Sequence, residues 1–231
     1  VNEAFRVLRT NFEFTIGTHP EQNVIVFTSF NPGSGKSHLA ANMAMSLAIK
    51  KKKVLLIDGD LRHGSTSMVI NSPGEGLSDY LNGRVADIHD ILYKGEENGL
   101  VKYFDVIPIG TIPPNPTELL FTPLLEQMIK TMRQEYDYVF IDCPPIEVVA
   151  DTPIYEQFAD RTIFVVRSGL MERSMLPEID ALYKEKKFKN MSLILNGTKA
   201  RGGRYGSHYG YGYGYGYGYN YNKEKSGGAK S

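Results

Sequence analysis

Several features are scarce in this sequence of 231 residues, and each absence narrows the class of protein. The chain has one cysteine, Cys143, which excludes an internal disulfide framework and a multi-cysteine metal site and favours a reducing compartment. No apolar run is long enough to span a membrane, and the first residues do not resemble a signal peptide. The 26 basic and 26 acidic residues cancel, so no overall field attracts nucleic acid. The five histidines lack metal-ligand spacing.

The most informative stretch is residues 24–38, where β-branched and aromatic residues lead into a glycine-rich turn and then an apolar helix-like segment. Such a turn can point backbone N–H groups into one concavity at the positive end of a helix, which suits a phosphate chain. Lys36 would reach the outer phosphates, and Ser37 would hold Mg²⁺. Phe30 stands where the pattern usually has glycine, but the strand before the turn and the buried helix after it outweigh an ordinary tight turn. The candidate nucleotide-binding residues here are Asn31, Pro32, Gly33, Ser34, Gly35, Lys36, Ser37 and His38.

The alternation of strand-like and helix-like segments predicts an α/β fold, a phosphate-loop parallel sheet flanked by helices. Expected strands are residues 24–27, 54–57, 104–109, 138–142, 160–166 and 191–195. Asp58 and Asp60 follow the second strand, and Asp142 ends the fourth. Because parallel strands end at one edge, these three acids are expected to meet there for metal binding or base chemistry. An Asp-Gly turn without chemistry is the alternative for the first two.

Other segments leave more than one interpretation open. Arg167 and Asn196 follow the last two strands and are candidates for binding the nucleotide base or ribose, with strand-end capping equally favoured. Residues 110–116 form a proline-rich loop that is either a connection capping a helix or a wall of the site. One amphipathic helix is expected from 117 to 133, and another helix from about 173 to 187. Cys143 is interpreted as a small buried residue rather than a nucleophile.

Two regions at the ends of the chain stand apart. Residues 3–14 have helical period, with Glu3, Arg6 and Arg9 along one face, which on pattern alone favours a solvated stripe. The chain does not begin with methionine, so we expect a domain cut from a longer protein.

From Thr198 apolar periodicity stops, which predicts a domain over 1–200 and a flexible tail over 201–231. The tail tyrosines are Tyr205, Tyr209, Tyr211, Tyr213, Tyr215, Tyr217, Tyr219 and Tyr221.

The alternating tyrosine and glycine of the tail has three interpretations: an adhesive low-complexity segment, an edge strand, or a substrate for phosphorylation. Composition alone favours the first. A phosphate loop upstream favours the third, because accessible phenols attached to a nucleotide site give that site a nearby acceptor.

Taken together, the motifs resemble those of the bacterial tyrosine kinases, the cytoplasmic catalytic domains of polysaccharide co-polymerases. The resemblance covers nearly the whole chain. Its motifs are Glu3-x-x-Arg6-x-x-Arg9, Pro32-Gly-Ser-Gly-Lys-Ser37 followed by Asn42, Asp58-Gly-Asp-Leu-Arg62, Gly110-x-x-Pro-Pro-Asn-Pro-Thr-Glu-Leu-Leu120, Phe140-Ile-Asp-Cys-Pro-Pro145 and the tyrosine cluster.

This resemblance implies a role for each matching residue. Lys36 would bind phosphates, Ser37 would ligate Mg²⁺, and Asp60 and Asp142 would hold the water shell of the ion. Asp58 would activate the tyrosine hydroxyl, and Arg62 would belong to the same site. The helix face of Glu3, Arg6 and Arg9 would close a ring of subunits, with eight as the candidate number, in place of the solvated stripe.

For the whole protein, the resemblance implies a protein-tyrosine kinase that uses ATP and Mg²⁺ and phosphorylates its own tail in trans. It further implies control of capsule and exopolysaccharide synthesis and export, through oligomerisation that phosphorylation regulates. The chain would be the cytoplasmic domain of an inner-membrane protein with its membrane-embedded region upstream, and nucleic acid would not be a partner. Two residues depart from the family pattern: Ser34 replaces a usual glutamate and His38 a frequent threonine, and both changes could lower nucleotide affinity or rate.

Two other functions stay open at this stage. A partitioning or cell-division-site ATPase would have similar strands and would hydrolyse ATP to switch a dimer. Those proteins carry lysine where this chain has Asn31, and they have no tyrosine tail. A nucleotide-binding scaffold with little catalysis, whose tail serves as an interaction segment, is the third candidate.

Overall fold

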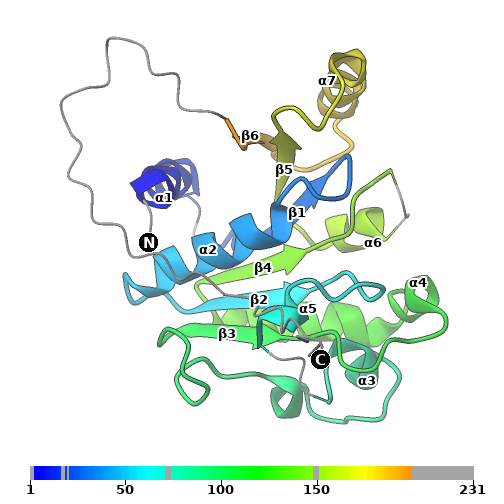
Figure 1. Ribbon diagram of the computed structural model, residues 1–231. Coiled ribbons are helices and arrows are strands. Elements are labelled where there is room, and N and C mark those ends of the chain that lie inside the picture. Colours follow the sequence, from blue (N-terminus) through cyan, green and yellow to red (C-terminus); the bar gives the residue numbers. More distant parts are fainter. Residues whose placement is uncertain (1–2, 17–18, 20, 71–73, 148–150, 199–231) are drawn as a thin grey trace, which may run out of the picture. The chain divides into compact units, whose positions relative to one another are not determined.

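The structure is a computed structural model that describes residues 3–16, 19, 21–70, 74–147 and 151–198. Its centre is a six-stranded sheet in the order β3-β2-β4-β1-β5-β6, in which every pair of neighbours is parallel (Figure 1). All six expected strands are present, so the predicted α/β fold is confirmed. The strands are β1 (Val24–Ser29), β2 (Val54–Asp58), β3 (Phe104–Ile107), β4 (Tyr138–Asp142), β5 (Arg161–Arg167) and β6 (Ser192–Asn196).

Helices cover both faces of this sheet (Figure 1). The α-helices are α1 (Glu3–Ile16), α2 (Lys36–Ala48), α3 (Leu77–Leu81), α4 (Pro116–Leu119), α5 (Pro123–Glu135), α6 (Thr152–Glu156) and α7 (Leu176–Lys184). Three short 3₁₀ helices are η1 (Ser67–Ile70), η2 (Ile88–Ile91) and η3 (Arg173–Met175). No helix among these described segments combines the length and apolar character that crossing a bilayer needs.

The core lies in layers on the two faces of the sheet. On one face α2 is covered by α1, which explains why α2 is apolar nearly all round: Met43 and Leu47 are fully buried against strand residues such as Phe140. On the other face α3, α5 and α6 pack against β2 and β4, and Tyr155 is fully buried there. Helix α7 forms a smaller cluster with Phe164 and Phe188.

Two helix predictions need correction, and one helix was missed. The segment expected as one helix over 117–133 is two helices, because Pro123 lacks an N–H and forces Thr122 into an extended conformation (φ −74°, ψ 147°). The helix expected to reach 187 ends at Lys184, and Lys186 just beyond it has a left-handed φ of 52°. Helix α6 was not predicted from the sequence.

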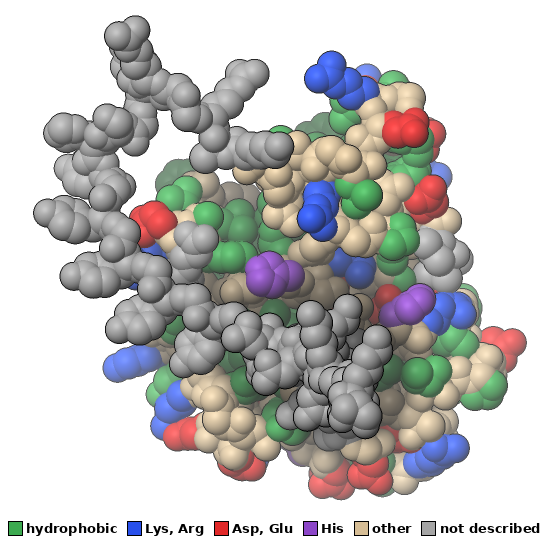
Figure 2. Space-filling view, in the orientation of Figure 1, with side chains coloured by type: hydrophobic (Ala, Val, Ile, Leu, Met, Phe, Trp, Pro, Cys, Tyr) green, Lys and Arg blue, Asp and Glu red, His purple; other side chains and the backbone are tan. Residues whose placement is uncertain are grey.

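The eight tail tyrosines and the predicted domain boundary near residue 200 lie outside the described residues, so both stay predictions. On the face shown in Figure 2, basic and acidic side chains of the described residues are interspersed. This mixed distribution agrees with the zero net charge.

Candidate active site

The site forms where β1, β2 and β4 end, because these three strands are neighbours and point the same way. The glycine-rich loop follows β1 and leads into α2 at Lys36. Asp58 is paired in register with Asp142 across β2 and β4. One edge of the sheet therefore brings together the loop and the acids, as the sequence predicts.

Glycine is required at two positions of the loop. Gly33 and Gly35 have φ of 74° and 88°, in the left-handed region that side chains disfavour. Gly35 is also the N-cap of α2, and a methyl group added there would collide with the amide of Asn196. The loop therefore adopts a turn that only this spacing of glycines allows without strain.

Side chains hold the loop from outside. The hydroxyls of Ser29 and Ser34 each donate to the carbonyl of Asn31 at 2.8 Å. The amide of Asn31 donates to Glu147 at 2.8 Å. Ser34, which replaces the glutamate usual in the family pattern, therefore supports the fold of the loop.

The two strand-end residues also contact this loop. Arg167 Nη1 donates to the carbonyl of Gly33 at 2.8 Å, and Asn196 Nδ2 donates to the carbonyl of Ser34 at 3.0 Å. These contacts are made to the phosphate loop, and a role of the two residues in binding the base or ribose stays a prediction.

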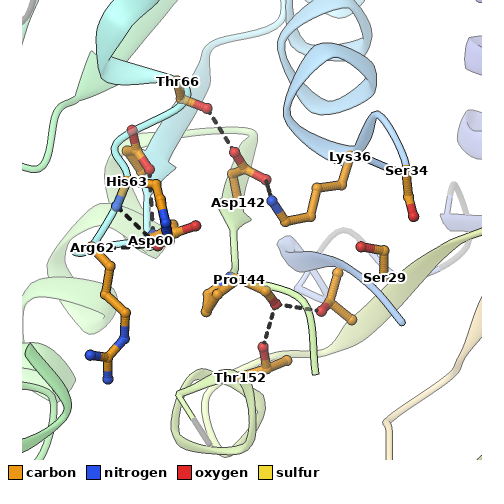
Figure 3. Close-up of polar contacts among 12 residues, drawn as sticks. Ser29, Ser34, Lys36, Asp60, Arg62, His63, Thr66, Asp142, Pro144 and Thr152 are labelled. Atoms are coloured by element: carbon orange, nitrogen blue, oxygen red, sulfur yellow. Dashed lines mark hydrogen bonds and ion pairs between the residues drawn. The ribbon is translucent and has the colours of Figure 1, made fainter. Parts of the chain in front are cut away.

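Lys36 points back across the site toward the acid of β4 (Figure 3). Its Nζ lies 3.9 Å from Asp142 Oδ1, and its side chain is 11% exposed. Asp142 is fully buried, and its Oδ2 accepts a hydrogen bond from Thr66 Oγ1 at 2.8 Å. Its Oδ1 has no hydrogen-bond partner. A buried carboxylate oxygen without a donor, beside a lysine, is suited to accept from water bound to Mg²⁺.

The pKa of Asp142 reflects the same surroundings. Burial raises this pKa, while the Lys36 charge and the hydroxyls of Ser37 and Thr66 oppose the increase. Ser37 is thus close to Asp142, as the proposed metal site requires. The donor set of hydroxyl and carboxylate oxygens fits Mg²⁺, a hard cation.

Asp58 differs from a base open to solvent, because it is buried and hydrogen-bonded. It is fully buried, and its Oδ2 accepts from both the backbone N–H and the hydroxyl of Ser67, each at 2.7 Å. Burial first, and then the charge of Asp142, raises the pKa of Asp58 to about 7, while the Ser67 hydrogen bonds oppose the increase. A group with this pKa can take up a proton near neutral pH. In this structure the carboxylate is closed to solvent, and its Oδ2 is occupied by the two Ser67 donors.

Asp60 lies at the same edge of the sheet and is buried. Its Oδ1 accepts from the backbone N–H groups of Arg62 and His63, each at 3.3 Å (Figure 3). This turn fixes the carboxylate after β2, close to Asp142, whose pKa it helps to raise.

Arg62 points away from Lys36 (Figure 3). Its Nη2 donates to Thr117 Oγ1 at 2.7 Å, and its Nε lies 3.6 Å from Asp151 Oδ2. The Thr117 hydroxyl in turn donates to Asp151 Oδ1 at 2.6 Å. The structure thus places Arg62 at the start of α4 rather than at the phosphate loop, and a catalytic role for it stays a prediction. Of the two interpretations of the proline loop, Pro116 at the first turn of α4 agrees with the capping connection.

His38 also has neighbours within the chain. Its ring meets Phe5 of α1 edge to face, with 6.1 Å between the ring centroids, and its carbonyl accepts from the amide of Asn42 at 2.8 Å. The side chain is exposed. His38 thus links α2 to α1 at the position where the family pattern often has threonine.

The proposed oligomer face of α1 is only partly exposed. Arg6 and Glu3 form an exposed ion pair at 3.3 Å. Arg9 instead turns inward, and its Nη1 donates to the carbonyl of Ser46 in α2 at 2.8 Å. Glu3 and Arg6 are available to another subunit, whereas Arg9 also binds within its own chain.

Several residues of the site were missed by sequence reasoning. They are polar residues in loops or short helices, where no periodic pattern marks them: Thr66, Ser67, Thr117, Glu147 and Asp151. The sequence hints are the hydroxyl-rich run Gly64-Ser-Thr-Ser67, which follows the acids of β2 closely, and the motif of residues 110–120, which includes Thr117. Cys143 is fully buried, and burial raises the pKa of its thiol, which agrees with its interpretation as a core residue.

The strand order, the loop after β1 and the acids after β2 and β4 define the class of protein: one with the phosphate-loop NTPase fold. Residues 22–168 match the family model described as AAA domain. Among solved structures, the septum site-determining protein MinD of Pyrococcus horikoshii, complexed with Mg-ADP, has a TM-score of 0.61 at 24% identity. The match covers 75% of this chain and 69% of the MinD chain. At that identity the likeness concerns the fold.

More similar proteins identify the family. CpsD of Streptococcus agalactiae, a tyrosine-protein kinase, is 33% identical over 89% of this chain and 87% of its own length. The tyrosine-protein kinase YwqD of Bacillus subtilis is 35% identical over 90% of this chain and 86% of its own. The kinase domain of the Escherichia coli tyrosine kinase ETK superposes with a TM-score of 0.77 at 32% identity, covering 91% of this chain and 80% of that domain.

This chain belongs to the bacterial tyrosine kinase family, which confirms the family expected from the motifs. The chain spans most of the length of some relatives but only 22% to 27% of the length of others, etk of E. coli among them.

Proposed function

We propose that this chain is an ATP-dependent protein-tyrosine kinase that phosphorylates the tyrosines of residues 205–221. The observation that carries the proposal is the pairing of Lys36 with the buried, undonated Oδ1 of Asp142 beside the glycine loop. This arrangement supplies a cation for the phosphates and a vacant acceptor for metal-bound water. Family membership supports tyrosine as the acceptor.

In this proposal the chain binds and orients ATP, and Mg²⁺ neutralises charge on its phosphates. The backbone N–H groups of the loop and the Lys36 ammonium hold the phosphates. Ser37 would bind the ion, and the carboxylates of Asp60 and Asp142 would accept from water bound to it. Asp58 takes the proton of the tyrosine hydroxyl, for which a pKa of about 7 is suitable.

The experiment is incubation of the purified protein with Mg²⁺ and ATP, followed by location of phosphate by mass spectrometry. We expect phosphotyrosine within residues 205–221, and none in Lys36→Met, which removes the positioning charge without removing core packing. A release of inorganic phosphate without phosphotyrosine would support the ATPase switch instead. Binding of ATP with neither product would support the scaffold.

We further propose that neighbouring subunits assemble as a ring, with eight as the candidate number, and that each phosphorylates the tail of another. Each phosphate adds roughly one and a half to two negative charges, so a modified tail is repelled by the acids of the site. Phosphorylation would then loosen the ring. By family resemblance, this cycle would control capsule and exopolysaccharide export from the cytoplasmic face of the inner membrane, beside a membrane-embedded co-polymerase region.

The contacts of α1 decide how the ring is tested. Because Arg9 also binds Ser46 within its own chain, replacing it disturbs α1 itself. The double variant Glu3→Ala, Arg6→Ala changes only exposed side chains and is compared with the triple variant that includes Arg9→Ala. We expect both variants to have lower mass by light scattering and less autophosphorylation. Unchanged mass and activity in both variants would instead support the alternative that Glu3, Arg6 and Arg9 form a helix face exposed to solvent and not a subunit contact.

A further inference from the structure

Side chains at the ends of β5 and β6 donate hydrogen bonds to the phosphate loop, and the proposed chemistry gives these side chains no role. Arg167 and Asn196 are register partners across these two strands. They donate to consecutive carbonyls of the loop, those of Gly33 and Ser34. Two neighbouring strand ends therefore hold two neighbouring peptide groups.

Anchoring a carbonyl also orients the N–H of the same peptide group. The peptide unit is planar and trans, so its C=O and N–H point in opposite directions. The Gly33 carbonyl shares its peptide with the N–H of Ser34, and the Ser34 carbonyl shares its peptide with the N–H of Gly35. Holding both carbonyls toward β5 and β6 therefore directs both N–H groups away from these strands. Backbone N–H groups of this kind bind phosphate.

Asn196 is fixed in the orientation that this role needs. Its Oδ1 accepts from the N–H of Gly197 at 2.8 Å, which leaves the amide nitrogen to donate to the loop. Its own carbonyl accepts from Ser168 at 2.9 Å. The lack of space for a methyl group at Gly35 shows how closely the Asn196 amide lies against the loop. Asn196 is half-buried, whereas Arg167 is exposed.

We propose that Arg167 and Asn196 are positioning residues that hold the phosphate loop by its carbonyls, and that they act on the phosphates of ATP rather than on its base. This inference rests on the proposed function, since it assumes that the loop binds ATP. It predicts that each side chain, by itself, affects the binding of ATP and of a polyphosphate without a nucleoside by the same factor.

The test compares Mg-ATP with Mg-tripolyphosphate, which has no base or ribose, by isothermal titration calorimetry. The variants are Arg167→Ala and Asn196→Ala. Arg161→Ala is the matched control, because Arg161 lies at the opposite end of the same strand and contacts Thr15 and Gln22 instead. Asn98→Ala controls for loss of an asparagine amide away from the phosphate loop, since its Nδ2 donates to the carbonyl of Lys94 at 2.8 Å. Thermal unfolding without ligand checks that every variant is folded.

We expect Asn196→Ala to weaken ATP and tripolyphosphate by the same factor, roughly tenfold, and Arg167→Ala by roughly threefold, as befits single hydrogen bonds of differing exposure. Both controls should bind like the unaltered chain. Weaker binding of ATP with unchanged binding of tripolyphosphate would assign the two residues to the base and overturn the inference. Unchanged binding of both ligands would also overturn it. If the unaltered chain bound neither ligand, the proposed function itself would fail.

Discussion

Arg62 gives the sharpest stability prediction, because its guanidinium faces a buried carboxylate. The side chain of Asp151 is 1% exposed, and that of Arg62 is 33% exposed. Replacing Arg62 with alanine leaves the carboxylate of Asp151 with the Thr117 hydroxyl as its remaining contact here. The change therefore leaves the buried Asp151 carboxylate without its cationic partner, while it removes little apolar surface.

The magnitude follows from the exposure of the two partners. Breaking a fully buried ion pair by removing one partner costs roughly 3–5 kcal/mol. Water screens Arg62, and Thr117 still donates to the carboxylate, so we expect a loss of about 2 kcal/mol in the free energy of unfolding. For a domain of this size that corresponds to a fall of roughly 4–8 °C in Tm. Removing the charge as well, in the double variant Arg62→Ala, Asp151→Asn, should recover part of the loss.

Urea unfolding followed by circular dichroism measures these values in a double-mutant cycle. Arg6→Ala is the matched control, because the Arg6 side chain is 62% exposed and pairs with an exposed glutamate. Its cost should stay within about 0.5 kcal/mol. The reasoning is refuted if Arg62→Ala costs no more than Arg6→Ala, or if the costs at 62 and 151 simply add.

Three other predictions test separate parts of the structure. Hydrogen bonds to Asp87 and Glu135 raise the pKa of His89. The protonated ring therefore stabilises the fold fully below the ordinary histidine pKa, and this contribution is lost as pH rises through the raised pKa. The free energy of unfolding measured from pH 5.5 to 9 should show this trend, and His89→Gln should lack it. Gly35→Ala should lower stability by about 1–2 kcal/mol and weaken Mg-ATP binding, because φ is left-handed there and the methyl group has no room; wild-type affinity in calorimetry would contradict it. Asp58→Asn should reduce kcat far more than nucleotide affinity, and equal losses in both would make Asp58 a binding residue.

The sequence predicted the sheet edge well, for a physical reason. Short apolar runs joined by helical crossovers can only form parallel strands, and parallel strands end together. The loop, Lys36 and the three acids were therefore brought to one place by topology alone. Predicting these residues required no knowledge of any side-chain contact.

Side-chain direction was less predictable, because it depends on partners far along the chain. Arg62 follows the acids closely in sequence, yet it turns toward Thr117 and Asp151, which come from two other segments. Asp58 accepts hydrogen bonds from Ser67, which begins the short helix η1 in a segment with no periodic pattern. The break at Pro123 was readable in principle, since proline disfavours helix in the residue before it.

Transfer of phosphate from one subunit's site to another subunit's tail can be measured by mixing two altered chains. One is Lys36→Met with its tail intact, and the other has an unaltered site but lacks residues 205–221. After incubation with Mg²⁺ and ATP, mass spectrometry locates phosphate on each chain. We expect phosphotyrosine on the tail of the Lys36→Met chain in the mixture, and no phosphate when that chain is incubated alone. If the unaltered full chain phosphorylates its tail but the Lys36→Met chain in the mixture carries no phosphate, transfer between subunits is wrong.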